Sequence, residues 1–170
     1  EAGRARALGK LAVNVEWFVR QLEYPELTRR WLQGLGVRDL DRGARDIEDL
    51  GRHAGPDARP RLARLAVLFD THLPRSSDPG MALANFERHV AVLPDPAAGL
   101  DRLISRPRTV EILLQVFSTS QHLSDLLIRR PELIDWLQAG AERRDRGTLI
   151  ADLWSTLTGP EAEADARLAI

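Results

Sequence analysis

The sequence predicts an all-α fold, a compact array of about nine to eleven short helices. Apolar residues recur through most of the chain at the three- and four-residue spacing that places them on one face of a helix. No stretch shows the alternation of apolar and polar residues that is typical of a half-buried strand. Aspartate or serine followed by proline begins several helical stretches, which favours short helices meeting at sharp angles.

Hydrophobic periodicity and turn residues place the expected helices in order along the chain. Pro25 is expected to begin the second helix, because the N–H that proline lacks would have no partner in a first helical turn. Glycine or proline is expected to end most of the others. The expected helices span residues 4–22, 25–34, 40–50, 61–73, 79–93, 96–104, 107–117, 121–130, 131–137 and 149–159, and a last one begins at 160.

Several of these starts are predicted from capping chemistry. A serine or aspartate side chain before a helix accepts backbone N–H groups that the first turn leaves without partners. Proline one or two residues later fits the first turn for the reason given above. The expected N-caps are Asp39 or Asp41, Asp78, Asp95, Ser105 and Ser120.

Residues 105–137 hold the densest helical signals, and we expect the other helices to be organised around them. The first helix of this unit carries four apolar residues on one face, which must be buried: Val110, Leu113, Leu114 and Phe117. In the helix expected over residues 79–93, Asn85, Arg88 and His89 are expected to lie away from the apolar side.

The clearest linker is residues 53–60, where one glycine and two prolines interrupt the helical pattern. The expected organisation is therefore an N-terminal helical segment of residues 1–55 and a second helical segment of residues 56–170. Because the sequence lacks an initial Met and stops within an apolar-periodic run, we expect a piece of a longer protein.

Composition excludes several functional classes. Twenty-four Lys and Arg against 25 Asp and Glu give a net charge of -1, so no overall field attracts nucleic acid or an anionic membrane. The absence of cysteine excludes disulfides and thiolate metal sites and is compatible with a reducing cytoplasm. No apolar run approaches the roughly 20 residues of a membrane span, and no signal peptide opens the chain.

Candidate metal ligands are better explained by structure. Asp39 and Asp41 superficially match the Asp-x-Asp pair of a nucleotidyltransferase, but at a helix start such side chains point about 200° apart and would not share one Mg²⁺. The histidines lack the three- or four-residue spacing of a helical metal pair, and each is expected at the surface or core boundary: His53, His72, His89 and His122.

Other chemistry also finds weak support. Ser118 and Ser120 lack the flanking glycines of a nucleophile elbow, and no glycines form a phosphate-binding loop. A helix-turn-helix over residues 107–129 would need an exposed recognition helix, whereas this one is strongly apolar. Arg88, Arg129 and Arg130 are interpreted as core-margin residues that pair with acids such as Glu87 or Asp125, with a substrate-facing role as the alternative.

Two runs of residues carry a family pattern. The first contains Asp78, Pro79, Ala82, Leu83, Asn85, Glu87 and Arg88, and the second contains Phe117, Ser120, Leu123, Asp125, Leu126, Leu127, Ile128, Arg129, Pro131 and Glu132. Together they resemble the N-terminal helical region of the bifunctional glutamine synthetase adenylyltransferase/adenylyl-removing enzymes. The resemblance is fullest over residues 76–137, and it contains no catalytic signature.

This resemblance implies that the parent protein is a cytoplasmic bacterial enzyme with two nucleotidyltransferase-like halves. Such enzymes transfer AMP from ATP to a tyrosine of glutamine synthetase and remove it by phosphorolysis, with control by the PII signalling protein and glutamine. The resemblance also implies Mg²⁺ and ATP as the parent's cofactors. The family's catalytic strand lies downstream of the matching helices, so no catalytic, cofactor-binding or metal residue is assigned in this chain.

The chain alone is therefore predicted to be inactive, a structural or interaction part of that parent. Its expected partners, by resemblance, are glutamine synthetase, the PII protein and the remaining nucleotidyltransferase domains of the parent chain. Two alternatives stay open: a stand-alone helical adaptor, and a helix-turn-helix-like nucleic-acid binder.

Overall fold

The computed structural model describes residues 24–134, in which helices are joined by short loops and no strand occurs. The all-α prediction is therefore confirmed for this part of the chain. The helices are α2 (Pro25–Gly34), α3 (Leu40–His53), α4 (Ala58–His72), α5 (Pro79–Ala91), α6 (Pro96–Ile104), α7 (Pro107–Thr119) and α8 (Gln121–Arg129), with a short 3₁₀ helix, η1 (Leu73–Arg75), after α4.

These seven helices are fewer than the nine to eleven predicted for the whole chain. The helices expected at residues 4–22 and 149–159, and the one from 160, lie outside the described residues. The helix expected from Pro131 begins two residues later, at Leu133, because Pro131 and Glu132 form a turn, and its part after residue 134 lies outside the described residues. Contacts divide the chain into two compact units, residues 1–131 and 132–170, and α2 to α8 all belong to the first.

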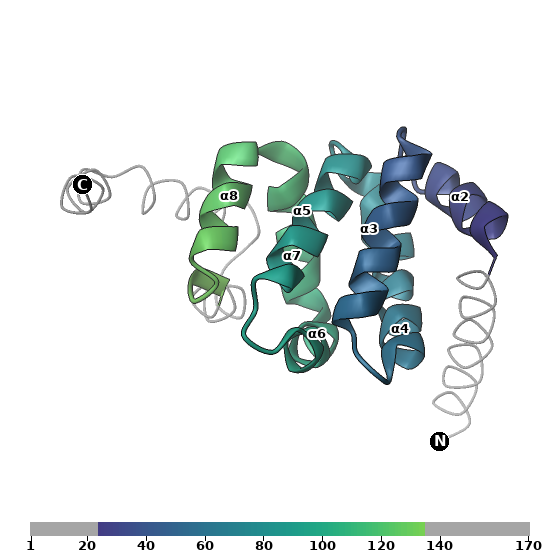
Figure 1. The fold of residues 1–170 in the computed structure, drawn as a ribbon. Helices are drawn as coiled ribbons and strands as arrows, with labels where there is room; N and C mark the ends of the chain where they lie inside the picture. The colour runs from purple at the N-terminus through teal and green to yellow at the C-terminus, as the bar shows by residue number, and fades with distance from the viewer. Residues whose placement is uncertain (1–23, 135–170) are drawn as a thin grey trace, which may run out of the picture. The chain divides into compact units, whose positions relative to one another are not determined.

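The helices of the first unit pack in two layers. α3, α5 and α8 lie side by side in one layer, and α4 and α7 lie behind them (Figure 1). α6 packs across one end against α4, α5 and α7, while α2 packs on α3. The division between residues 1–55 and 56–170 stays a prediction, and the packing of α3 on α5 crosses it.

α7 and α5 form the centre of the unit, as expected for the stretch that begins at residue 105. α7 contacts α4, α5, α6 and α8. Its predicted apolar face is fully buried, with Val110, Leu113 and Phe117 each at 0% exposure. Between the layers, the rings of Phe69 and Phe86 meet edge to face with their centroids 5.3 Å apart.

Four of the five predicted N-cap positions are correct. The side chains of Asp39, Asp78, Asp95 and Ser120 each accept a backbone N–H three residues later. Ser105 is an exception, because it follows the last residue of α6 and its hydroxyl donates to the carbonyl oxygen of Arg102 at 2.7 Å. Arg106 takes the N-cap position of α7 instead.

The linker predicted over residues 53–60 is shorter in the structure. α3 continues to His53 and α4 already begins at Ala58, which places Pro60 in the first helical turn. Proline fits there because the first turn has no N–H partners to lose. Gly55 makes the reversal with a φ of +72°, a conformation that other residues rarely adopt.

Candidate functional site

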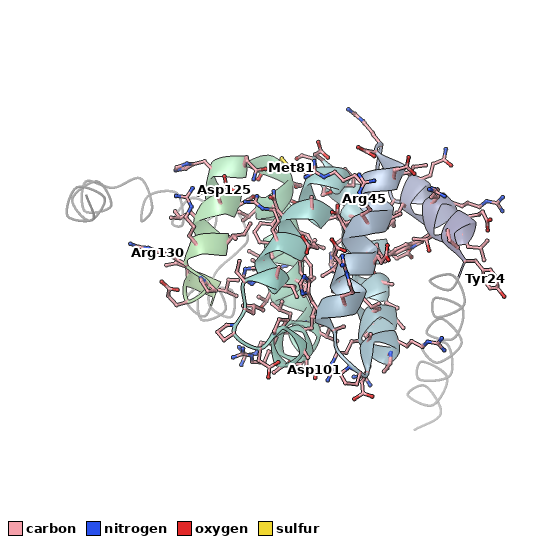
Figure 2. The ribbon with its side chains drawn as sticks, viewed as in Figure 1. Tyr24, Arg45, Met81, Asp101, Asp125 and Arg130 are labelled. Carbon is pink, nitrogen blue, oxygen red and sulfur yellow. The ribbon has the colours of Figure 1, made fainter. Side chains whose placement is uncertain are left out.

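A charged cleft of about 570 Å³ lies between α3 and α5, close to the first residue of α8. It combines arginines and aspartates from both helices with small residues and a methionine. The lining residues are Val37, Arg38, Asp39, Arg42, Gly43, Asp46, Asp78, Gly80, Met81, Ala84, Asn85, Arg88 and Gln121. In Figure 2, Met81 of α5 lies near the top of the view and Asp101 of α6 lies at the bottom.

The loop before α3 brings the starts of α3 and α5 together. Gly36 turns this loop with a φ of +88°, and a Cβ built there would lie 3.4 Å from Cγ of Pro79, the first residue of α5. Val37 follows and is 4% exposed. A Cβ at Gly43 would lie 3.1 Å from Val37 Cγ1, so glycine at this position lets the loop pack closely on α3.

A polar network closes the end of the cleft toward α8. Asn85 is 2% exposed, and its Nδ2 donates to the carbonyl oxygen of Phe117 at 3.1 Å and to Gln121 Oε1 at 3.2 Å. Gln121 Nε2 donates back to Asn85 Oδ1 at 3.1 Å. Arg88 Nη1 donates to the same Asn85 oxygen at 3.1 Å and to Asp125 Oδ1 at 2.9 Å. These bonds join α5, α7 and α8.

This network fulfils one sequence expectation and corrects another. Arg88 pairs with Asp125 of the neighbouring helix, as the core-margin interpretation expects. The two hydrogen bonds to Asp125, from Gln121 first and from Arg88, hold the pKa of that carboxyl below its usual range. Asn85, however, was expected away from the apolar side, and it is buried because its carboxamide satisfies a carbonyl at the end of α7.

Asp46 has the most unusual environment among the carboxylates of the cleft. No hydrogen bond or ion pair reaches its side chain from another residue of the described part of the chain. Burial raises the pKa of the Asp46 carboxyl from 3.8 to about 6, with Arg42 opposing that shift and Glu87 adding to it. At neutral pH the protein therefore holds a half-buried carboxylate that solvent and neighbours stabilise poorly.

Glu87 meets α3 from the side of α5. His53 Nε2 lies 3.1 Å from Glu87 Oε1, and both side chains are partly buried. The predicted partner of Glu87 is an arginine, and the structure provides this histidine instead. The pair joins α3 and α5 about two helical turns beyond Asp46.

The candidate metal pair takes up separate structural roles. Asp39 Oδ1 accepts the backbone N–H of Arg42 at 2.9 Å, and Asp41 Oδ1 accepts both Nε and Nη2 of Arg29, at 3.1 and 2.8 Å. These carboxylates do not fit a shared Mg²⁺. Within residues 24–134 no group of three or more metal-ligating side chains comes together.

The histidine prediction is wrong at one position. His53 and His72 lie at the core boundary and His122 is exposed, as expected. His89 instead is buried at 1% exposure, and its ring lies 6.0 Å from the ring of Phe117. Burial lowers the pKa of His89 to about 4, so the ring is neutral and serves as an apolar core residue.

The remaining candidates are structural or exposed. Ser118 Oγ donates to the Gln115 carbonyl at 2.9 Å, and Ser120 caps α8, so neither faces a catalytic base. Arg129 and Arg130 are exposed at the end of α8. None of the described helices is long and apolar enough to cross a membrane.

Sequence reasoning missed three charged residues of the cleft. Asp46 follows Arg45 and precedes Ile47 in an ordinary amphipathic helix, so only the packing of α5 on α3 distinguishes it from other aspartates. Arg38 and Arg42 also gave no signal by themselves. Arg38 precedes the N-cap Asp39 and Arg42 lies in α3, so their spacing in the sequence does not place them on one helical face.

Comparison with curated proteins finds a bifunctional glutamine synthetase adenylyltransferase/adenylyl-removing enzyme of Xanthobacter autotrophicus, 35% identical over 111 residues. The match covers 65% of this chain and 10% of that enzyme, so it spans about one tenth of the relative's length. It confirms the resemblance drawn from the two sequence runs. No family model matches the chain, and no solved structure matches it at a significant level.

Proposed function

We propose that this chain is a helical bracing and interaction part of a bacterial cytoplasmic enzyme that adenylylates and deadenylylates glutamine synthetase. In this proposal the chain performs neither reaction by itself. Mg²⁺, ATP and the transferring carboxylates belong to nucleotidyltransferase domains elsewhere in the parent. Glutamine synthetase is the protein partner, and the PII protein is the regulator of that parent.

The observation that carries this proposal is the use of the shared family residues. Asp78 caps α5, Asn85 bonds the end of α7, Glu87 meets His53, Arg88 pairs with Asp125, and Ser120 caps α8. Each therefore contributes to folding and helix packing. Phosphoryl-type transfer depends on carboxylate-held metal to position substrate and neutralise charge, and none of these residues is available for that role.

The test measures catalysis and binding separately. In one assay the purified 170-residue chain is incubated with glutamine synthetase and labelled ATP. In a second assay it is incubated with adenylylated glutamine synthetase and phosphate. The full-length relative is the positive control in both. We expect turnover only from the full-length enzyme. We also expect the chain to bind glutamine synthetase or to bind the rest of the parent enzyme in calorimetry. Turnover by the chain, or binding to neither protein, would overturn the proposal.

A nucleic-acid binder remains the rival function, and the packing of α8 argues against it. The helix-turn-helix reading needs an exposed second helix, whereas Leu123, Leu127 and Ile128 of α8 are at most 8% exposed. Nucleic-acid binding by this chain would weaken steeply with salt, so a filter-binding titration at low and high ionic strength tests the rival directly.

A further inference from the structure

We propose that the cleft between α3 and α5 is the docking site for a polypeptide segment of a partner protein that carries a basic side chain next to an acidic one. The inference rests on the proposed function of the chain as an interaction part. The basic side chain pairs with Asp46, and the acidic one with Arg38 and Arg42.

Asp46 is the reason for a basic side chain. Its carboxylate lines the cleft without a hydrogen bond or ion pair from the rest of residues 24–134. Burial is the largest influence on its pKa and raises it, Arg42 and Arg45 offset that effect only in part, and Glu87 adds a negative charge nearby. Ionising Asp46 in this setting costs stability, as its raised pKa indicates. A cation delivered by a partner would favour the ionised form, so the poor environment in the isolated chain becomes a favourable one in the complex.

Arg38 and Arg42 are the reason for an acidic side chain. Both line the cleft, both are exposed, and no acceptor within the described residues forms a hydrogen bond or ion pair with either guanidinium. Asp39 lies between them but accepts the backbone N–H of Arg42 as the N-cap of α3. Arg38 lies in the loop before α3 and Arg42 lies near the start of α3. Both guanidiniums match a carboxylate well, because each presents a rigid fork of donors.

The mixed charge of the cleft favours a polypeptide that carries both signs of charge over a ligand that is purely anionic. Asp39, Asp46 and Asp78 would repel a phosphate or a nucleic-acid backbone, which offers negative charge alone. Between the charges, Ala84 and Gly80 leave room for a backbone to approach.

The test is an NMR titration of the isotope-labelled chain with a short blocked peptide of alternating lysine and glutamate. We expect shifts of backbone amides in the first halves of α3 and α5. Asp46→Asn and the pair Arg38→Gln with Arg42→Gln should each weaken binding by about tenfold, which corresponds to about 1.4 kcal/mol. Two matched controls should change it less than about twofold: Glu48→Gln on α3, and Arg64→Gln with Arg102→Gln on α4 and α6.

Asp46→Asn gives the readout that a purely structural role would not produce. The substitution should stabilise the free chain against urea, because it removes a buried charge. It should also weaken peptide binding, because it removes the carboxylate that pairs with the basic side chain of the peptide. The inference is overturned if the peptide causes no shifts, if the control arginines matter equally, or if an all-glutamate peptide or inorganic phosphate shifts the same amides equally well. None of these outcomes bears on catalysis or on binding to glutamine synthetase, so the proposed function is tested separately.

Discussion

Asn85 of α5 donates a hydrogen bond to the carbonyl oxygen of Phe117 at the end of α7, 3.1 Å away. The last four carbonyls of a helix have no partner within it, and Phe117 provides one of these. Asn85 therefore satisfies a backbone group that burial would otherwise leave without a partner. The bond joins the two central helices at the point where the chain turns into α8.

Replacing Asn85 with alanine should lower the free energy of unfolding by about 1 to 3 kcal/mol, because a buried acceptor and the Gln121 carboxamide lose their partner. Urea unfolding measures this as a lower midpoint at an unchanged slope. Gln33→Ala, at an exposed position of α2, is the control and should change the stability little. A loss at Asn85 no larger than at Gln33 would contradict this role.

The two serines once predicted as N-caps give a matched pair of variants. Ser120 Oγ accepts the backbone N–H of Leu123 at 3.3 Å, so Ser120→Ala should cost about 1 kcal/mol of stability. Ser105 does not cap the start of a helix, so the free energy of unfolding of Ser105→Ala should stay within about 0.5 kcal/mol of that of the unsubstituted chain. Thermal or urea unfolding of both variants measures this difference. Equal losses of stability in the two variants would contradict the N-cap role of Ser120.

The helices that the sequence predicted correctly depend on local chemistry. Asp78, Asp95 and Ser120 begin helices because their side chains reach the nearest free N–H groups, and that geometry needs no information from distant residues. Ser105 shows the limit of the same reasoning. Its local signal equals that of Ser120, but α6 runs up to Ile104, so this serine follows one helix instead of beginning the next.

Burial of polar residues was not predictable from one helix at a time. His89 and Asn85 lie on the face of α5 that α7 covers, and a single-helix pattern assigns such residues to solvent by their polarity. The environment of the cleft was likewise not predictable from a single helix. Asp46 becomes unusual when Glu87 and the rest of α5 approach α3, and that pairing joins segments about 40 residues apart.

Asp46→Asn should stabilise the chain at neutral pH. The folded-state pKa of about 6 lies above the ordinary value of 3.8, so stability is highest below pH 3.8 and is lost as the pH rises through 6. Full conversion of that difference corresponds to about 3 kcal/mol, and solvent screening of this half-buried group reduces it to about 1 to 2 kcal/mol. Urea unfolding at pH 7.5 and pH 4 measures it, with Glu48→Gln as the control. No gain from Asp46→Asn at pH 7.5 would refute the prediction.

His89 should impose the opposite pH dependence. Its folded-state pKa of about 4 lies below the ordinary 6.5, so the unfolded chain takes up a proton between these values while the native chain does not. Stability is therefore fully present above pH 6.5 and falls as the pH is lowered to 4, by about 3 kcal/mol for so buried a ring. In the chain without substitutions, Asp46 gains stability as the pH falls from 6 to 4 and so partly masks the loss from His89. Replacing His89 with leucine should remove the loss between pH 6.5 and 4, whereas His122→Gln at the exposed start of α8 should preserve it. If the urea midpoint of His89→Leu fell with decreasing pH as steeply as that of the unsubstituted chain, the buried ring would not be the cause of the loss of stability in acid.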